Sequence, residues 1–118
     1  MGAVATRVDT AVTRLLDDLR SRGGLRGADV ANIVGVSPPT VSRWGSGLSA
    51  PPLQTQTVIA DLRFVVDRLS DFYAPDEIRL WLHASHPLLQ ERPVDLIHAG
   101  RTKEILAVID RLESGAYL

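Results

Sequence analysis

The chain has no cysteine among its 118 residues, so disulfide bonds and thiolate metal ligands are excluded. Its longest uninterrupted apolar run is far too short to cross a bilayer. The opening stretch, MGAVATRVDT, lacks the apolar segment of a signal peptide. No strand pattern, internal repeat or low-complexity segment is present. These absences predict an all-α protein of the cytoplasm with no membrane partner.

Arrangements of residues that would support catalysis are also missing. His83 and His86 are three positions apart, which could pair two ligands on a helix, but Pro87 interrupts a helix there. We therefore interpret both as loop or core histidines. The acidic pairs Asp17-Asp18 and Asp76-Glu77 are expected to be solvated helix charges, since nothing near them in sequence would desolvate them. We expect no catalytic residue, no metal, no cofactor and no enzymatic activity.

Charge is spread unevenly along the chain, whose formal net charge is −1. Residues 1–50 carry six Arg and four Asp, whereas residues 51–118 carry six Arg, one Lys, six Asp and four Glu. The first half could approach phosphate and the second should repel it. We therefore expect two surfaces with different partners.

The stretch over residues 27–44, GADVANIVGVSPPTVSRW, predicts two short helices joined by a tight turn. Ala31 is small enough to let the helices touch, and Gly35 falls four positions later, where the turn needs a positive φ. Ser37 can cap the second helix, and Pro38 suits its first position. The shared apolar face consists of Val30, Val34, Val36, Val41 and Trp44. The set indicates a helix-turn-helix; the alternative is a plain pair of antiparallel helices within a bundle.

The second helix of this motif carries the candidate DNA contacts, Ser37, Thr40, Ser42 and Arg43. Hydroxyl groups and a guanidinium fork suit contacts to bases and phosphates. The pair Pro38-Pro39 removes two backbone donors, so sequence discrimination is expected to be modest or to require a dimer. The motif could instead be a packing scaffold that does not bind DNA.

Two longer helices are predicted before and after this motif. The first ends at Gly23-Gly24 and has as its apolar face Val4, Val8, Ala11, Val12, Leu15, Leu16 and Leu19. The second runs from about Leu53 to Tyr73, with Phe64 off its apolar stripe of Val58, Ile59, Leu62, Val65, Val66, Leu69, Phe72 and Tyr73. This stripe is wider than one small domain needs. It indicates a helix that bridges the two halves of the chain or helps to form a dimer, and the dimer is tested at Val65 or Leu69. Burial on two sides within one subunit is equally open.

The remaining chain predicts three short helices. One starts at Ala74-Pro75, one starts at Pro93 and stops at Gly100, and Thr102 is expected to cap the last. The last helix should turn four side chains inward and end at Gly115; these are Ile105, Leu106, Ile109 and Leu112. Trp44 and Trp81 are interpreted as core anchors.

The motifs of the second half, together with SPPTVSRW in the first, resemble the MbcA/ParS/Xre family of toxin-binding antitoxins over about residues 25–118. The motifs are Trp81-Leu82, Leu88-Leu89, Pro93-x-Asp95-Leu96-Ile97, Gly100 and a final helix from Ile105 to Leu112 followed by Gly115-Ala116-Tyr117. Two pairs of residues depart from the family pattern: Ser85-His86, where Pro-Asn is common, and Pro38-Pro39.

This resemblance implies a type II antitoxin whose partner is a RES-fold toxin that degrades NAD. In such pairs the antitoxin is a homodimer, its helix-turn-helix binds operator DNA, and its C-terminal end enters the active-site cleft of the toxin. On this chain the blocking residues would be Gly115, Ala116, Tyr117 and Leu118. Residues 1–52 would be the DNA-binding region and residues 53–118 the dimerisation and toxin-binding region.

The residues of the tail favour the same role, because a free end that finishes in Tyr and Leu suits an interface anchor. Tyr117 could alternatively fold back onto the last helix and seal the core. The competing function is a free-standing helix-turn-helix transcriptional regulator whose second half only dimerises. A toxin encoded beside this chain would distinguish the two functions.

Overall fold

The computed structural model describes residues 10–115, and within this range the chain is helical apart from turns and an isolated bridge between His86 and Glu91. The predicted all-α fold is confirmed. The helices are α1 (Ala11–Gly23), α2 (Gly27–Val34), α3 (Pro38–Ser46), α4 (Leu53–Leu69), α5 (Pro75–His83), α6 (Pro93–His98) and α7 (Thr102–Glu113).

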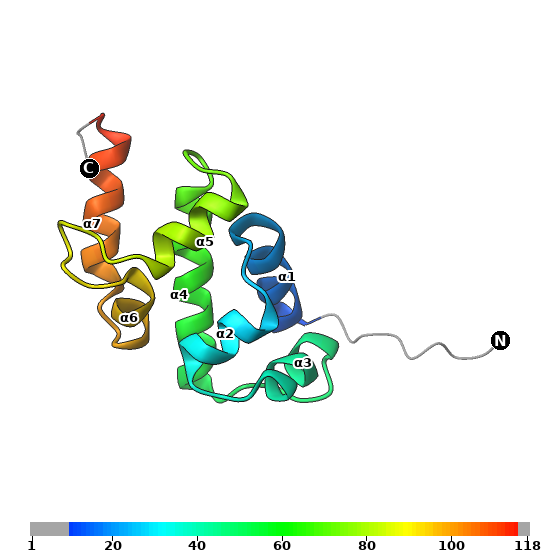
Figure 1. Cartoon of the computed structure of the whole chain (residues 1–118). Coiled ribbons are helices and arrows are strands. Elements are labelled where there is room, and N and C mark those ends of the chain that lie inside the picture. Colours follow the sequence, from blue (N-terminus) through cyan, green and yellow to red (C-terminus); the bar gives the residue numbers. More distant parts are fainter. Residues whose placement is uncertain (1–9, 116–118) are drawn as a thin grey trace.

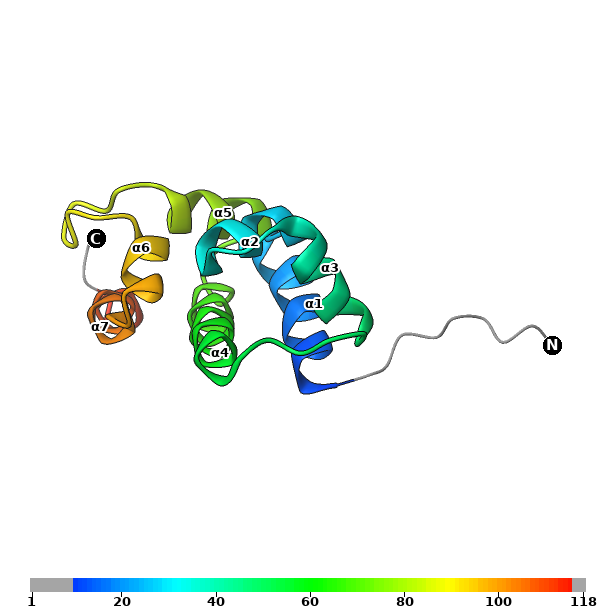
Figure 2. The same cartoon turned by 90° about the horizontal axis from the view of Figure 1, so that it is seen from below.

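Helix α4 runs through the middle of the molecule (Figure 1). Helices α1 and α2 pack on one side of it and α6 and α7 on the other, while α3 packs on α1 and α2. Helix α5 contacts both α1 and α6 and so joins the two sides above α4. The perpendicular view shows the same order, with α4 between α1 and α7 (Figure 2).

The apolar stripe of α4 is buried within a single chain. Five of its side chains have no exposed surface at all: Ile59, Leu62, Val65, Val66 and Leu69. Helices on both sides of α4 supply the covering surface, so the width of the stripe needs no second copy. The expectation of a dimer contact through Val65 and Leu69 is therefore wrong, because both side chains belong to the core of the monomer.

Close packing between α1 and α4 depends on a glycine. A Cβ placed on Gly23 would lie 3.0 Å from each of the two Cγ atoms of Val66. Such distances are tighter than most Cβ contacts, so a side chain at this position would require Val66 to shift, and glycine lets the end of α1 approach α4 without that shift. The sequence predicted Gly23 as a helix terminus, and the structure adds this packing role.

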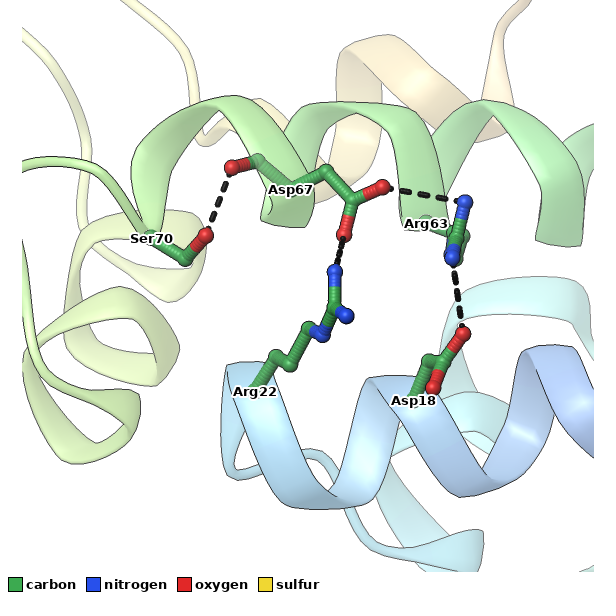
Figure 3. A network of polar contacts seen from close by, with 5 residues as sticks. All are labelled: Asp18, Arg22, Arg63, Asp67 and Ser70. Atoms are coloured by element: carbon green, nitrogen blue, oxygen red, sulfur yellow. Dashed lines mark hydrogen bonds and ion pairs between the residues drawn. The ribbon is translucent and has the colours of Figure 1, made fainter.

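A network of ion pairs covers the same contact at the surface (Figure 3). Arg63 of α4 donates to Asp18 of α1 at 2.8 Å and also pairs with Asp67 at 2.9 Å. Arg22 of α1 pairs with the other oxygen of Asp67 at 2.6 Å. These side chains are partly exposed, so solvent screens each pair and its contribution to stability is small. Asp18 is thus paired rather than simply solvated.

Two predictions about inward positions and helix ends are wrong. Thr102 does not cap α7: it is the first helical residue, and its hydroxyl donates to Asp61 of α4 at 3.1 Å. The residue before α7 is Arg101, which makes no side-chain cap. Ala11, predicted to face inward, is exposed at the start of α1.

One continuous cluster of buried side chains links the elements on either side of position 52. Trp44 is 4 % exposed and lies inside this cluster, whereas Trp81 is half-buried and packs against its edge. Helix α4 contributes to the core on both of its sides. The division into regions 1–52 and 53–118 stays a prediction about function, since the packing is shared.

Candidate functional site

Helices α2 and α3 form the turn-linked pair that the sequence predicted. Gly35 has φ +79°, a conformation that favours glycine, and its amide donates to the carbonyl of Ala31 at 2.8 Å. Ala31 has no exposed surface, so it lies where the helices meet. Ser37 precedes Pro38, and its hydroxyl accepts from the amide of Thr40 at 3.4 Å. The local geometry is therefore that of two short helices fixed by a tight turn.

Asp29 fastens α2 to α5. Its carboxylate accepts the amide of Arg26 at 2.9 Å at the start of α2 and the guanidinium of Arg79 of α5 at 2.9 Å. Burial opposes ionisation of Asp29, but the hydrogen bonds from Arg79 and Arg26 outweigh it, so the pKa lies below its usual value. This pair, in which Asp29 is buried and Arg79 is exposed, was missed by sequence reasoning and couples the helix pair to the second half of the chain.

The structure brings together three of the four candidate DNA-contact residues. The hydroxyls of Ser37 and Thr40 are 2.8 Å apart, and Nη2 of Arg43 donates to Thr40 at 3.4 Å. These three side chains form a hydrogen-bonded row along α3. Ser42 is exposed but stands apart, on the side of α3 that lines a cleft beside α1.

That cleft has a volume of about 530 Å³ and lies between α1, the start of α2, and α3. Its floor is mainly apolar, with Leu25, Val30 and Val41, and its rim carries Arg20 and Ser42. Gly45, which lies within α3, also lines the cleft.

The N-terminus of α3 has few backbone groups to offer a phosphate. Pro38 and Pro39 carry no N–H, and the amide of Thr40 already donates to the carbonyl and the hydroxyl of Ser37. Contacts to nucleic acid at this helix would therefore fall to side chains, chiefly Arg43, which is exposed.

The second candidate site begins at the end of α7. Gly115 has φ +80° and its amide donates to the carbonyl of Leu112, so the chain leaves the helix axis at the predicted position. Of the four candidate toxin-binding residues, Ala116, Tyr117 and Leu118 lie outside the described residues. Arg68 of α4 donates to Asp110 at 2.7 Å and to Glu113 at 2.7 Å, which fixes the last turn of α7.

The histidines occupy structural positions. His83 ends α5, and its Nδ1 pairs with the carbonyl of Arg79 at 2.8 Å. His86 is buried in the following loop, where burial lowers its pKa and its Nδ1 accepts the amide of Leu88 at 3.1 Å. His98, not singled out from the sequence, pairs with the carbonyl of Ile33 at 2.7 Å and so joins α6 to α2.

Among residues 10–115, no group of three or more His, Asp or Glu side chains could hold a metal ion. Within the same range, no helix is both long and apolar enough to cross a membrane.

Known proteins similar to this chain in sequence were identified by comparison. No protein-family model matches the chain. The probable mycobacterial cidal antitoxin Rv3188 of Mycobacterium tuberculosis (strain ATCC 25618 / H37Rv) is 33 % identical, over 98 % of this chain and 100 % of that relative. The mycobacterial cidal antitoxin MbcA of Mycobacterium bovis (strain ATCC BAA-935 / AF2122/97) is 29 % identical, over 100 % of this chain and 98 % of that relative.

A solved structure agrees with these sequence relatives. A chain in the crystal structure of the M. tuberculosis MbcT–MbcA toxin–antitoxin complex superposes with a TM-score of 0.81 at 28 % identity, covering 93 % of this chain and 100 % of that one. Fold and sequence together define the class of protein, an antitoxin of a toxin–antitoxin system. The chain belongs to the mycobacterial cidal antitoxin family, which confirms the resemblance found in its motifs.

Proposed function

We propose that this antitoxin neutralises a RES-fold, NAD-degrading toxin encoded beside it, as one half of a type II pair. Residues Gly115, Ala116, Tyr117 and Leu118 would enter the active-site cleft of the toxin. The protein would act as a homodimer and repress its own operon through α3. It would need no cofactor and carry out no reaction itself.

Full-length similarity to MbcA, including a chain taken from a toxin–antitoxin complex, carries this proposal. The match extends over both halves of the chain, so the region expected to contact the toxin is included. Charge supports different partners for the two halves, since residues 51–118 carry ten acidic and seven basic side chains. An acidic surface repels DNA and suits a protein partner.

The end of α7 is suited to present a tail. Arg68 is 23 % exposed at its side chain and bonds both Asp110 and Glu113, so the last turn is tied to the central helix. Gly115 then redirects the chain. A tail that leaves a fixed root loses less freedom on binding than one that leaves a frayed helix.

Binding to operator DNA would depend on the side chains of α3. Arg43 is the basic side chain of α3, and the first turn of that helix has no N–H at Pro38 or Pro39. We therefore propose weak, salt-sensitive binding that gains strength from two copies.

Co-expression tests the proposal. The protein from the adjacent reading frame should arrest growth and deplete cellular NAD when expressed alone, and this chain should restore both and co-purify with it. Arg43→Ala serves as the matched control, because it alters α3 and leaves α7 intact; it should restore growth equally well. Growth arrest without NAD loss would contradict the RES assignment. A neighbour that is harmless, or that does not bind the chain, would favour the free-standing regulator.

A further inference from the structure

The cleft between α1, the start of α2 and α3 has the dimensions of a small-molecule site. Its volume of about 530 Å³ lies within the range of about 300–1,000 Å³ that such sites occupy. Pro38, Val41 and Gly45 line one wall at spacings of three and four residues along α3, so this wall is about 10 Å long. Leu25 and Val30 lie in the floor and are themselves buried. The hollow is therefore an elongated groove with an apolar floor.

Two glycines that line this groove are not required by the described packing. A Cβ on Gly27 would lie 3.8 Å from Val41, and a Cβ on Gly45 would lie 3.9 Å from Leu16, which are both ordinary van der Waals distances. Neither glycine has a positive φ. Glycine inside a helix is less favourable than alanine, so Gly45 lowers the stability of α3 and leaves space in the groove. Space kept at a cost in stability indicates room for a ligand.

The two ends of the groove differ in polarity. Leu16 faces Gly45 near the end of α3, and Leu48 lies beyond it, so this end is apolar. Arg20 lies one helical turn further along α1, toward the start of α2; it is exposed and makes no ion pair with a described residue. Asp17 is also on the rim, but it already takes part in an interaction of its own. The groove thus offers a basic group at one end and aliphatic surface at the other.

The lining residues favour an aliphatic chain over a ring system. No aromatic side chain from the described part of the chain lines the groove, so none is placed to stack on an aromatic ligand. A flexible hydrocarbon chain can follow a groove walled by leucine, valine and proline, and it gains affinity by leaving water. A carboxylate at one end of such a chain would meet Arg20, because a guanidinium forms paired hydrogen bonds with carboxylates.

We propose that this groove binds a medium-chain fatty carboxylate, with the carboxylate on Arg20 and the hydrocarbon chain over Val41 toward Leu16 and Leu48. The site goes beyond the antitoxin function proposed above, since binding requires neither a toxin nor DNA.

Titration of the full chain with decanoate tests the ligand class. Isothermal titration calorimetry should give one site with a Kd of about 0.1 mM, as expected for a ligand of this size. Decan-1-ol has the same chain without the charge and should bind about fivefold more weakly. Arg20→Gln should weaken decanoate binding by the same factor and leave decan-1-ol binding unchanged. Arg111→Gln changes an exposed arginine of α7 and, as the matched control, should bind decanoate as the wild type does.

Filling the groove tests the location. Gly45→Leu should abolish decanoate binding, while the melting temperature stays the same or rises because leucine replaces glycine in a helix. Gly27→Ala fills less of the groove and should weaken binding by a smaller factor. Ala107→Leu, at an exposed position of α7, is the matched control and should bind normally. Amide chemical shifts in a ¹⁵N-labelled chain should change mainly within residues 16–28 and 38–48 when decanoate is added.

Four results would overturn the proposal: no binding of decanoate, equal affinity for decan-1-ol, chemical-shift changes centred on another part of the chain, or full affinity in a folded Gly45→Leu protein. If Gly45→Leu does not fold, Gly27→Ala decides instead, and unchanged affinity in that variant would overturn the site. None of these results bears on rescue from a toxin, so the antitoxin proposal is tested separately.

Discussion

His86 organises the loop between α5 and α6 through its backbone and its ring. Its carbonyl accepts the amides of Leu89 and Gln90, its amide donates to the carbonyl of Glu91 at 3.2 Å, and its Nδ1 accepts from Leu88. Only the neutral ring can accept that hydrogen bond. Burial lowers its pKa below the usual 6.5, which means that the folded chain resists a proton that the unfolded chain takes up.

The free energy of unfolding should therefore fall as the pH drops below about 6.5 toward the lower folded pKa, and should be unaffected by this group above it. Urea unfolding between pH 7 and pH 5 measures the slope. His86→Asn introduces the residue that is common at this position in the antitoxin family. The side-chain oxygen of Asn can accept a hydrogen bond from the same amide, that of Leu88, and it does not titrate. In that variant the free energy of unfolding should depend less on pH, whereas His83→Gln should keep the pH dependence that His86 contributes. An unchanged slope in His86→Asn would contradict this account.

Arg43 is the residue on which DNA binding depends in our proposal, since the first turn of α3 has no spare backbone donors. Arg43→Ala should weaken retardation of the upstream operon region. If Arg43 contacts a phosphate, the salt slope should fall by about one unit. If it reads guanine, about 1–3 kcal/mol should be lost at one base pair. Arg111→Ala changes an exposed residue of α7 and should alter neither the salt slope nor the preference at any base pair. Equal effects of both variants would indicate non-specific attraction.

Two helical glycines allow the packing of α1 against α4 to be tested with a matched pair. Gly23→Ala would bring a methyl group within 3.0 Å of Val66 and should destabilise the fold by about 1–3 kcal/mol, partly offset by better helix propensity. At Gly27 the nearest atom to a new Cβ is 3.8 Å away, on Val41, which is an ordinary contact. Gly27→Ala should be neutral or slightly stabilising. Thermal melts of both variants decide whether the α1–α4 distance is as tight as described.

The buried stripe of α4 gives a second prediction for this element. Val65 has no exposed surface, so Val65→Lys should abolish cooperative unfolding rather than release a folded monomer, because an unpaired buried charge costs several kcal/mol. Circular dichroism and the melting profile provide the measurement. A folded, monomeric Val65→Lys protein would show that the side chain lies in an interface after all.

Several helix boundaries were readable from the sequence because their signals are local, although α4 ends at Leu69 and not at the expected Tyr73. Gly35, Gly100 and Gly115 all adopt positive φ at predicted helix ends, and Pro75 and Pro93 both start helices. The orientation of α4 was not readable, since one wide apolar stripe is compatible with a core on two sides or with a dimer. Thr102 illustrates the same limit: its partner Asp61 is 41 positions away, so no local rule anticipates the bond.

At the level of the whole molecule, polar contacts away from α4 also join the two halves. Asp29 binds Arg79, and the carbonyl of Ile33 pairs with Nδ1 of His98 at 2.7 Å. Both contacts tie α2 to the helices that precede α7. The candidate DNA-binding row and the candidate toxin-binding tail are thus supported by one framework, although sequence alone assigned them to separate regions. The positions of the candidate residues followed from local motifs, but this connection required the fold.

The tail is where the residue types and the family resemblance lead to the same proposal. Within the described residues, α7 is held by Ile105 and Ile109 in the core and by Arg68 at its last turn, and a deletion of residues 116–118 leaves these contacts in place. The truncated protein should therefore keep its free energy of unfolding to within about 0.5 kcal/mol, its dimer and its operator binding. It should nevertheless fail to rescue cells from the partner toxin.

A finer variant separates the tail's chemistry from its length. Tyr117→Ala keeps the chain full-length and removes the aromatic ring, which as an interface anchor should cost about 2 kcal/mol or more of toxin affinity. If Tyr117 instead seals the core, both variants should melt at a lower temperature while retaining affinity for the toxin. Full rescue by a stable truncated protein would exclude a plug, because the toxin would then be inhibited with its cleft left open. Growth, melting temperature and toxin affinity measured on the same two variants distinguish these outcomes.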